Sequence, residues 1–251
     1  DLFGDSVAIS GDTIVIGARF EDSAASGVNG SQDNGLTDSG AAYVFVRDGA
    51  TWSQQAYLKA SNPDIWDHFG YAVAIDGDTI VVGAFAEDGG AEDAGAAYVF
   101  VREGGTWSEQ AYLKASNTGG SDHFGAAVSV SGDTVVVGSY GEDSSSTGVN
   151  GPQNELGGNS GAAYVFTRQG GVWTQQAFLK ASNTGTGDQF GTAVATSGDT
   201  IVVGAPGENS NSTGVNGHQA NEDAGDSGAA YVFTRTAGTW SQQAYVKASN
   251  T

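Results

Sequence analysis

Short apolar segments separated by polar turns run along the whole chain, and one series of four segments recurs. Its clearest copy covers residues 69–75, 79–84, 96–102 and 106–116. The second segment, Thr79 to Ala84, is rich in β-branched residues and apolar at successive positions, which is typical of a strand covered on both faces. The fourth segment alternates between apolar and polar residues, which predicts two unlike faces. The expected apolar face carries Trp107, Ala111, Leu113 and Ala115, and the expected polar face carries Ser108, Gln110 and Lys114.

A short turn joins the first two segments of every copy. This turn consists of Asp76-Gly77-Asp78 in this copy and of Ser-Gly-Asp in the others. So short a link predicts a tight hairpin that turns at Gly77-Asp78. No segment has the apolar period of 3.6 that marks a helix. We therefore expect an all-β chain of antiparallel strands.

The repeat sets the expected architecture. Phe-Gly occurs at residues 3–4, 69–70, 124–125 and 190–191, and the four strand segments follow each pair. Four strands in each repeated unit are typical of the blades of a β-propeller. We expect a single propeller-type domain, 1–251, with repeats at 1–62, 63–117, 118–183 and 184–251. Tryptophan, lysine and arginine each keep one position in every repeat: Trp52, Trp107, Trp173 and Trp240; Lys59, Lys114, Lys180 and Lys247; Arg47, Arg102, Arg168 and Arg235.

Three motifs carry a resemblance to a known family. They are the Phe-Gly pair, Val-Gly-Ala after the second segment (extended to Val203-Gly204-Ala205-Pro206 in the last repeat), and Gly-Ala-Ala-Tyr-Val-Phe starting at Gly40, Gly95, Gly161 and Gly228. Across the whole chain these units resemble FG-GAP repeats, the blades of the integrin α-subunit propeller and of bacterial surface proteins. The resemblance implies an extracellular or cell-surface protein, which we expect to be microbial, with a role in binding or adhesion.

The chain departs from that family in two ways. Many members hold calcium in the hairpin between strands one and two, but here this hairpin is only three residues long, so those ligands have no counterpart. Integrin propellers have seven blades, whereas this chain supplies four repeats. Three arrangements stay open: a small four-bladed ring, a segment of a longer array, or a protomer completed by its neighbours.

The variable segments are expected to share one end of the blades. Loops that join strands two and three emerge at the same end as the links between repeats, because consecutive strands are antiparallel. Repeats 1, 3 and 4 carry a longer insert in the first of these loops, with a shared Gly-Val-Asn-Gly at residues 27–30, 148–151 and 214–217. Insertions of repeat proteins often collect on the binding face, so we expect the functional face here.

Acidic residues are expected to face one another at this end. A hairpin that turns at Gly77-Asp78 places Asp67 opposite Glu87 and Asp88. The equivalent acids of all four repeats are Asp1, Glu21, Asp22, Asp67, Glu87, Asp88, Asp122, Glu142, Asp143, Asp188 and Glu208. Facing like charges are unfavourable, and two explanations are open. A Ca²⁺ ion would balance them, or the carboxylates cap turns, accept backbone hydrogen bonds and pair with the repeated lysines.

Charge and composition exclude several classes of partner. The net charge of −20 comes from 29 acidic and nine basic residues. Such a surface repels nucleic acid and anionic lipid, and no apolar run is long enough for membrane insertion. The absence of cysteine excludes disulfides and thiolate metal sites. No serine has the basic and acidic neighbours of an activated nucleophile, so we expect no enzyme.

The expected function is a non-enzymatic extracellular scaffold for binding and adhesion through the acidic loops, with Ca²⁺ as the candidate cofactor. Its partner would be a protein or glycan on the loop face, or other copies of the chain. The alternatives are a structural protomer that assembles into an extracellular fibre or surface layer, and a glycan-active enzyme that uses paired carboxylates. Candidate partner-binding residues are Trp66, Asn29, Asn150 and Asn216, and the glycosylation motif occurs at Asn29 and Asn211.

Overall fold

Four antiparallel sheets of four strands each make up the fold of the computed structural model, which describes residues 1–250. Within each sheet the strands lie side by side in chain order. The first two sheets comprise β1 (Ser6–Ser10), β2 (Thr13–Ala18), β3 (Ala41–Asp48), β4 (Thr51–Leu58), β5 (Ala72–Asp76), β6 (Thr79–Ala84), β7 (Ala96–Glu103) and β8 (Thr106–Leu113). The other two comprise β9 (Ala127–Ser131), β10 (Thr134–Ser139), β11 (Ala162–Gln169), β12 (Val172–Leu179), β13 (Ala193–Ser197), β14 (Thr200–Ala205), β15 (Ala229–Thr236) and β16 (Thr239–Val246).

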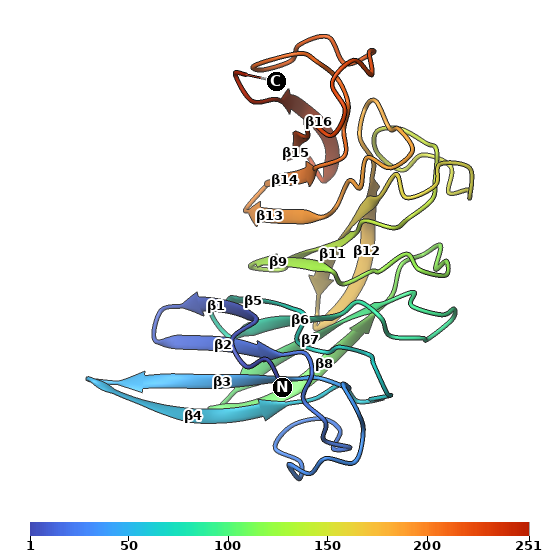
Figure 1. The fold of residues 1–251 in the computed structure, drawn as a ribbon. Coiled ribbons are helices and arrows are strands. Elements are labelled where there is room, and N and C mark those ends of the chain that lie inside the picture. Colours follow the sequence, from blue (N-terminus) through green and yellow to red (C-terminus); the bar gives the residue numbers. More distant parts are fainter. Residues whose placement is uncertain (251) are drawn as a thin grey trace.

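The four sheets follow one another like propeller blades, and the first and last lie at opposite ends of an open arc (Figure 1). The described residues contain strands, turns and loops but no helix, so the all-β prediction is confirmed. The predicted hairpin is also confirmed, because Asp76 pairs with Thr79 across the Gly77-Asp78 turn. Gly77 has a φ of 56°, a left-handed conformation that glycine adopts without steric cost.

Adjacent sheets pack face to face, and the first strand of each sheet lies beside the first strand of the next. Three apolar clusters fill the three interfaces between neighbouring sheets. In the first cluster, Val44 and Leu58 of one sheet pack against Ile80, Tyr98 and Phe100 of the next. Burying sheet faces in pairs is therefore what stabilises the array.

The fourth strand departs from the alternation expected from its sequence. Val99 of β7 pairs with Ala111 of β8, but the next residue, Phe100, pairs with Glu109, so Gln110 is the extra residue of a β-bulge. The bulge reverses the faces beyond it. Trp107 packs toward the first sheet, whereas Ala111, Leu113 and Ala115 pack toward the third. The prediction that these four residues share a face was wrong, because a strict period of two does not survive an inserted residue.

The bulged glutamine joins each sheet to the next. Gln55 Oε1 accepts a hydrogen bond from Trp107 Nε1 at 2.7 Å, and the pairs Gln110–Trp173 and Gln176–Trp240 repeat this contact at 2.8 Å each. Every one of these indoles also lies beneath an arginine guanidinium of its own sheet. The repeated tryptophans are thus wedges between sheets with a satisfied N–H.

Candidate functional site: the acidic loop face

The inserts and the links between sheets meet at one end of the molecule, as predicted. We call this end the loop face and define it as residues 1–5, 19–40, 59–71, 85–95, 114–126, 140–161, 180–192 and 206–228. Backbone hydrogen bonds join each link between sheets to the preceding loop between strands two and three. They run from the N–H of Phe69, Phe124 and Phe190 to the carbonyls of Ser39, Ala94 and Ser160 at 3.0, 2.9 and 3.0 Å.

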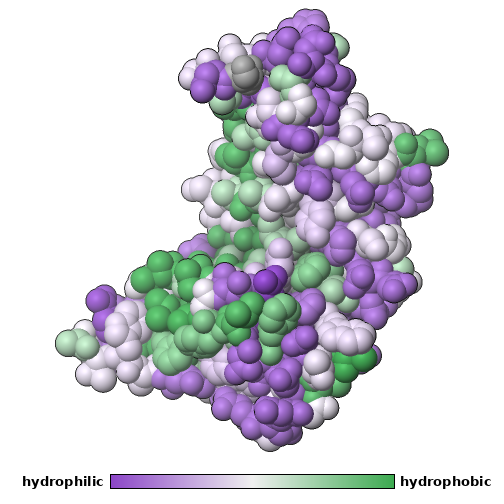
Figure 2. Space-filling view, viewed as in Figure 1, coloured by the Kyte–Doolittle hydropathy of each residue, from purple (hydrophilic) through white to green (hydrophobic). Residues whose placement is uncertain are grey.

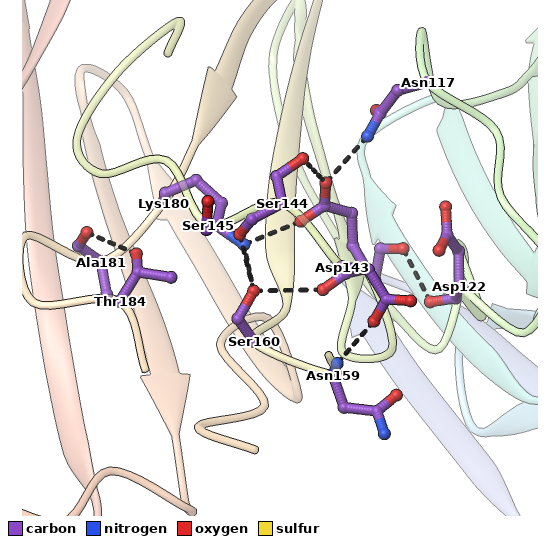
Figure 3. A network of polar contacts seen from close by, with 12 residues as sticks. Asn117, Asp122, Asp143, Ser144, Ser145, Asn159, Ser160, Lys180, Ala181 and Thr184 are labelled. Carbon is purple, nitrogen blue, oxygen red and sulfur yellow. Dashed lines mark hydrogen bonds and ion pairs between the residues drawn. The ribbon is translucent and has the colours of Figure 1, made fainter. Parts of the chain in front are cut away.

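A lysine–glutamate ion pair lies beneath the loop face in every repeat. Nζ to Oε2 distances are 2.9 Å for Lys59–Glu21, 2.9 Å for Lys114–Glu87, 2.8 Å for Lys180–Glu142 and 2.7 Å for Lys247–Glu208. Lys180 and Glu142 are both fully buried. Lys180 also donates to Ser160 Oγ at 2.7 Å, while Glu142 accepts from Asn117 Nδ2 at 2.8 Å and from Ser144 Oγ (Figure 3).

This pair connects three separate segments. Glu142 lies at the start of an insert, Ser160 at its end, and Lys180 just after β12. Burial lowers the pKa of Lys180, and the facing carboxylate opposes that shift. Burial pushes the pKa of Glu208 upward, but Lys247 and neighbouring hydrogen bonds outweigh it and hold that pKa below its usual value. The lysines therefore fix the bases of the inserts.

In each of the three links between sheets, a buried aspartate accepts a hydrogen bond from a backbone N–H of the same link. Asp67 Oδ2 accepts from Asp64 N–H at 2.7 Å, Asp122 Oδ2 from Gly119 N–H at 2.8 Å, and Asp188 Oδ2 from Gly185 N–H at 2.7 Å. Burial, with a smaller contribution from the nearby glutamate, raises the pKa of Asp67 to about 7 and those of Asp122 and Asp188 to about 6. The sequence predicted that these aspartates lie near Glu87, Glu142 and Glu208. The structure agrees, because the charge of each glutamate contributes to the raised pKa of its aspartate.

The residue after each glutamate closes the turn within the insert. Asp22, Asp88 and Asp143 accept the backbone N–H groups of Asp38, Asp93 and Asn159, and Asn209 accepts that of Asp226. Asp1 lies beside the first insert, where its carbonyl accepts the N–H of Phe20 at 3.3 Å. All the acids singled out in the sequence thus lie on the loop face.

These side chains do not fit the calcium ligand set that we considered from the sequence. The glutamate oxygens are already bound by an ammonium group, and the link aspartates accept backbone N–H groups. Among residues 1–250, no group of three or more His, Asp and Glu side chains has the arrangement of a metal site. The contacts support the alternative of turn capping and lysine pairing, and calcium binding stays a prediction from the sequence.

The Gly-Val-Asn-Gly segments fold back on the outer strand of their sheets. Asn29 Oδ1 accepts the N–H of Tyr57 at 2.9 Å, and Asn150 and Asn216 make the same bond to Phe178 and Tyr245. These asparagines adopt φ values of 56°, 55° and 54°, as expected at tight turns. Their side-chain oxygens therefore cover a sheet edge. The side chain of Asn211, the other residue of a glycosylation motif, lies 3.4 Å from Asp223 Oδ2.

Trp66 differs from its counterparts. It is 58% exposed, and its φ of 63° lies in the left-handed region, where bulky residues are strained. The same position holds Ser121 and Gly187 in the next two links, both also with positive φ. A large exposed indole at such a position supports its assignment as a candidate contact residue.

The sequence did not reveal a row of rings that crosses three sheets beside the links. Phe20 contacts His68, which stacks on Phe85 at 5.4 Å, and Phe85 and Tyr140 both contact His123. Burial lowers the pKa of both histidines, so they favour the neutral form. Their place before Phe-Gly was visible in the sequence, but nothing indicated that residues after the second strands would meet them.

Charge is distributed unequally between the two ends. Each of the nine lysines and arginines forms an ion pair with a different carboxylate. Among residues 1–250, twenty of the 29 acids have no basic partner. Sixteen of these acids lie on the loop face: Asp1, Asp22, Asp33, Asp38, Asp64, Asp67, Asp88, Glu92, Asp93, Asp122, Asp143, Glu155, Asp188, Glu222, Asp223 and Asp226. The net negative charge is therefore largely a property of this face.

Comparison with protein families identifies the repeat. A model of the FG-GAP repeat matches residues 1–45, 52–100, 107–166 and 173–233, which is most of the chain. Three of the four matches begin at Trp52, Trp107 and Trp173, so the matched unit spans the fourth strand of one sheet and the first three strands of the next. No curated protein sequence matches the chain. The described residues contain no apolar helix of membrane-spanning length.

Proposed function

Because this chain belongs to the FG-GAP repeat family, we propose that it is a non-enzymatic scaffold for binding and adhesion outside the cell, whose loop face binds a basic protein surface. The observation that carries this proposal is the charge distribution. Every lysine and arginine is already paired, and sixteen acids without a basic partner among residues 1–250 share one face. Thirteen of these acids are at least partly exposed, and Asp67, Asp122 and Asp188 are buried. A surface of one sign attracts a partner of the other sign and accelerates its association.

The construction of the face suits binding without large rearrangement. Buried ion pairs fix the base of each insert, and backbone hydrogen bonds join inserts to links. Exposed Glu92, Glu155 and Glu222 project from this fixed base. A fixed surface loses little conformational freedom when a partner docks, which favours affinity.

A glycan-active enzyme is less well supported. Glycosidases place two carboxyl groups in unlike environments at one site. Among residues 1–250, four carboxyl groups have a raised pKa, and three of them, Asp67, Asp122 and Asp188, recur in three links with the same backbone contact. The fourth, Glu109, lies outside the loop face and accepts a hydrogen bond from Ser61 Oγ at 2.9 Å, with no second acid paired to it there. Repetition of this kind favours a structural role for these acids.

A pair of charge-matched variants tests the proposal. The first neutralises the loop face (Glu92→Gln, Glu155→Gln and Glu222→Gln), and the second neutralises three exposed acids outside it (Asp48→Asn, Asp76→Asn and Glu103→Gln). Affinity for an oligolysine peptide is measured by fluorescence anisotropy at low and high salt. We expect the first variant to weaken binding about fivefold to tenfold and the second less than about twofold. Equal weakening by both variants would overturn the assignment of the face.

A further inference from the structure

Within residues 1–250, the first and the last sheet each have one face that no other sheet covers. In every sheet we call the face directed toward the previous sheet in the chain the leading face, and the face directed toward the next sheet the trailing face. The open leading face belongs to the first sheet and comprises Phe3, Val7, Ile9, Ile14, Ile16, Tyr43, Phe45 and Trp52. The open trailing face belongs to the last sheet and comprises Ala195, Val202, Val232, Ala244 and Val246.

The open leading face is apolar and exposed. Val7 is 69% exposed, Ile9 67% and Phe3 54%, whereas Phe69, Phe124 and Phe190, the equivalents of Phe3, are fully buried. Figure 2 shows the resulting hydrophobic patch over β1 and β2. Monomeric proteins rarely leave so large an apolar patch in water.

The open trailing face is the counterpart of the leading face. Val202 is 38% exposed, while Val15, Val81 and Val136, at the same position in the other sheets, are fully buried against the next leading face. Inside the molecule, these valines are buried by the leading face of the next sheet, whose apolar and aromatic residues correspond to those of the open leading face. The two open faces therefore have the chemistry of one interface that already occurs three times within the chain.

Polar groups complete the match. At each internal interface a bulged glutamine accepts from the tryptophan of the next sheet. The last glutamine of this series, Gln243, is exposed, and the first tryptophan, Trp52, is 42% exposed. A second polar contact also recurs: the hydroxyls of Ser10 and Ser131 accept hydrogen bonds from the N–H groups of Gly77 and Gly198 in the next sheet. The equivalent acceptor on the open trailing face is Ser197, and the equivalent donor on the open leading face is the N–H of Gly11.

We propose that a second copy of this chain docks head to tail, with the trailing face of its last sheet on the leading face of the first sheet. Gln243 of one copy then accepts from Trp52 Nε1 of the other, and Val202 packs against Ile14 and Ile16. The contact joins two unlike faces, so it produces a closed ring or a longer array according to the rotation between copies. It uses a surface other than the loop face and does not depend on the function proposed for that face.

Two single-face variants test the docking. Ile9→Asp blocks the leading face, and Ala195→Asp blocks the trailing face; both positions are exposed within one copy, so neither charge needs to be buried for folding. Mass is measured by sedimentation across a range of concentrations. We expect the unmodified chain to form species of two or more copies, and each variant alone to remain a single copy, because a buried unpaired charge weakens such a contact at least about tenfold.

Mixing the variants gives the decisive result. The open trailing face of Ile9→Asp fits the open leading face of Ala195→Asp, so the mixture forms a one-to-one complex that cannot grow further. Leu156→Asp, at a 79% exposed loop residue, adds the same charge elsewhere and leaves the association unchanged. A single-copy mass for the unmodified chain at every concentration, or association of either variant with itself, would overturn the proposal. Thermal unfolding of each variant confirms that the sheets remain folded.

Discussion

Lys180 Nζ lies 2.8 Å from Glu142 Oε2, and neither side chain is exposed to solvent. The two residues are 38 positions apart in the chain, so the pair joins the outer strand of the third sheet to the start of its insert. The equivalent pairs recur in the other repeats. The loop face is thus fixed at its base by a repeated contact, and exposed acids such as Glu92, Glu155 and Glu222 lie at its surface.

The first prediction concerns this pair. Lys180→Met leaves the buried Glu142 carboxylate without its cation, and we expect the free energy of unfolding to fall by about 3–5 kcal/mol. Adding Glu142→Gln removes the uncompensated charge and should recover at least half of that loss. Chemical denaturation measures both variants. A cost below about 1 kcal/mol for the single substitution would contradict the role assigned to the pair.

The second prediction compares two equivalent glutamines. Gln110→Leu deprives the nearly buried Trp173 Nε1 of its acceptor and should lower the free energy of unfolding by about 1–2 kcal/mol. Gln243→Leu, at the open trailing face, removes no side-chain hydrogen bond to any other residue in 1–250, and it should change the free energy of unfolding by less than about 0.5 kcal/mol. Denaturation at a concentration where the chain is a single copy measures this difference, and equal effects would refute the assigned contact.

The third prediction is a pH dependence. Burial raises the pKa of Asp67 to about 7 and those of Asp122 and Asp188 to about 6, from 3.8. A raised pKa means that the folded state binds the proton more tightly than the unfolded state does. Stability from these groups is therefore complete below pH 3.8 and is lost as the pH rises through 6 to 7.

Thermal melts across this range check the sign. The melting temperature should fall between about pH 5 and pH 8, and the triple variant Asp67→Asn, Asp122→Asn and Asp188→Asn should show a shallower fall, since asparagine keeps the acceptor but does not titrate. Below about pH 4.5, protonation of Glu87 and Glu208, whose pKa values lie below their usual range, opposes this trend. A melting temperature that rises from pH 5 to pH 8 would contradict the burial of these aspartates.

The fourth prediction separates strain from function at Trp66. Glycine occupies this position in a later link and adopts its positive φ without strain. Trp66→Gly should therefore leave the free energy of unfolding unchanged or raise it by up to about 1 kcal/mol. If the indole is a contact residue, the same variant weakens partner binding. A destabilisation above about 1 kcal/mol, measured by denaturation, would show instead that the indole holds the link in place.

The sequence predicted much of the fold, because its local signals agree with one another. Phe-Gly repeats, β-branched segments and the Gly77-Asp78 turn all indicate meandering sheets, and the structure has them. The bulge at Gln110 was not predictable, since neither Glu109 nor Gln110 carries a turn signal, and the bulge changes the side on which Ala111 packs. An alternating pattern therefore predicts which side chains share a face of the sheet only up to the next bulge.

The site was predictable in position but not in its contacts. Antiparallel connectivity placed the acids at one end, and the structure confirms that placement. Glu142 is neutralised by Lys180, which follows a different strand. The spacing of the two residues in the sequence does not show whether the lysine side chain reaches the insert. The ring row through His68 and Phe85 likewise depends on how neighbouring sheets are placed, which no single segment encodes.

The binding role of the loop face is tested most directly by mapping where a cationic peptide binds. Amide chemical shifts of the isotope-labelled chain are recorded as oligolysine is added. The proposed function predicts that shifts concentrate in the loops between strands two and three, at residues 19–40, 85–95, 140–161 and 206–228. It also predicts that the hairpins around Gly49, Gly104 and Gly170 stay unchanged. Shifts spread evenly over both ends, or concentrated at those hairpins, would contradict it.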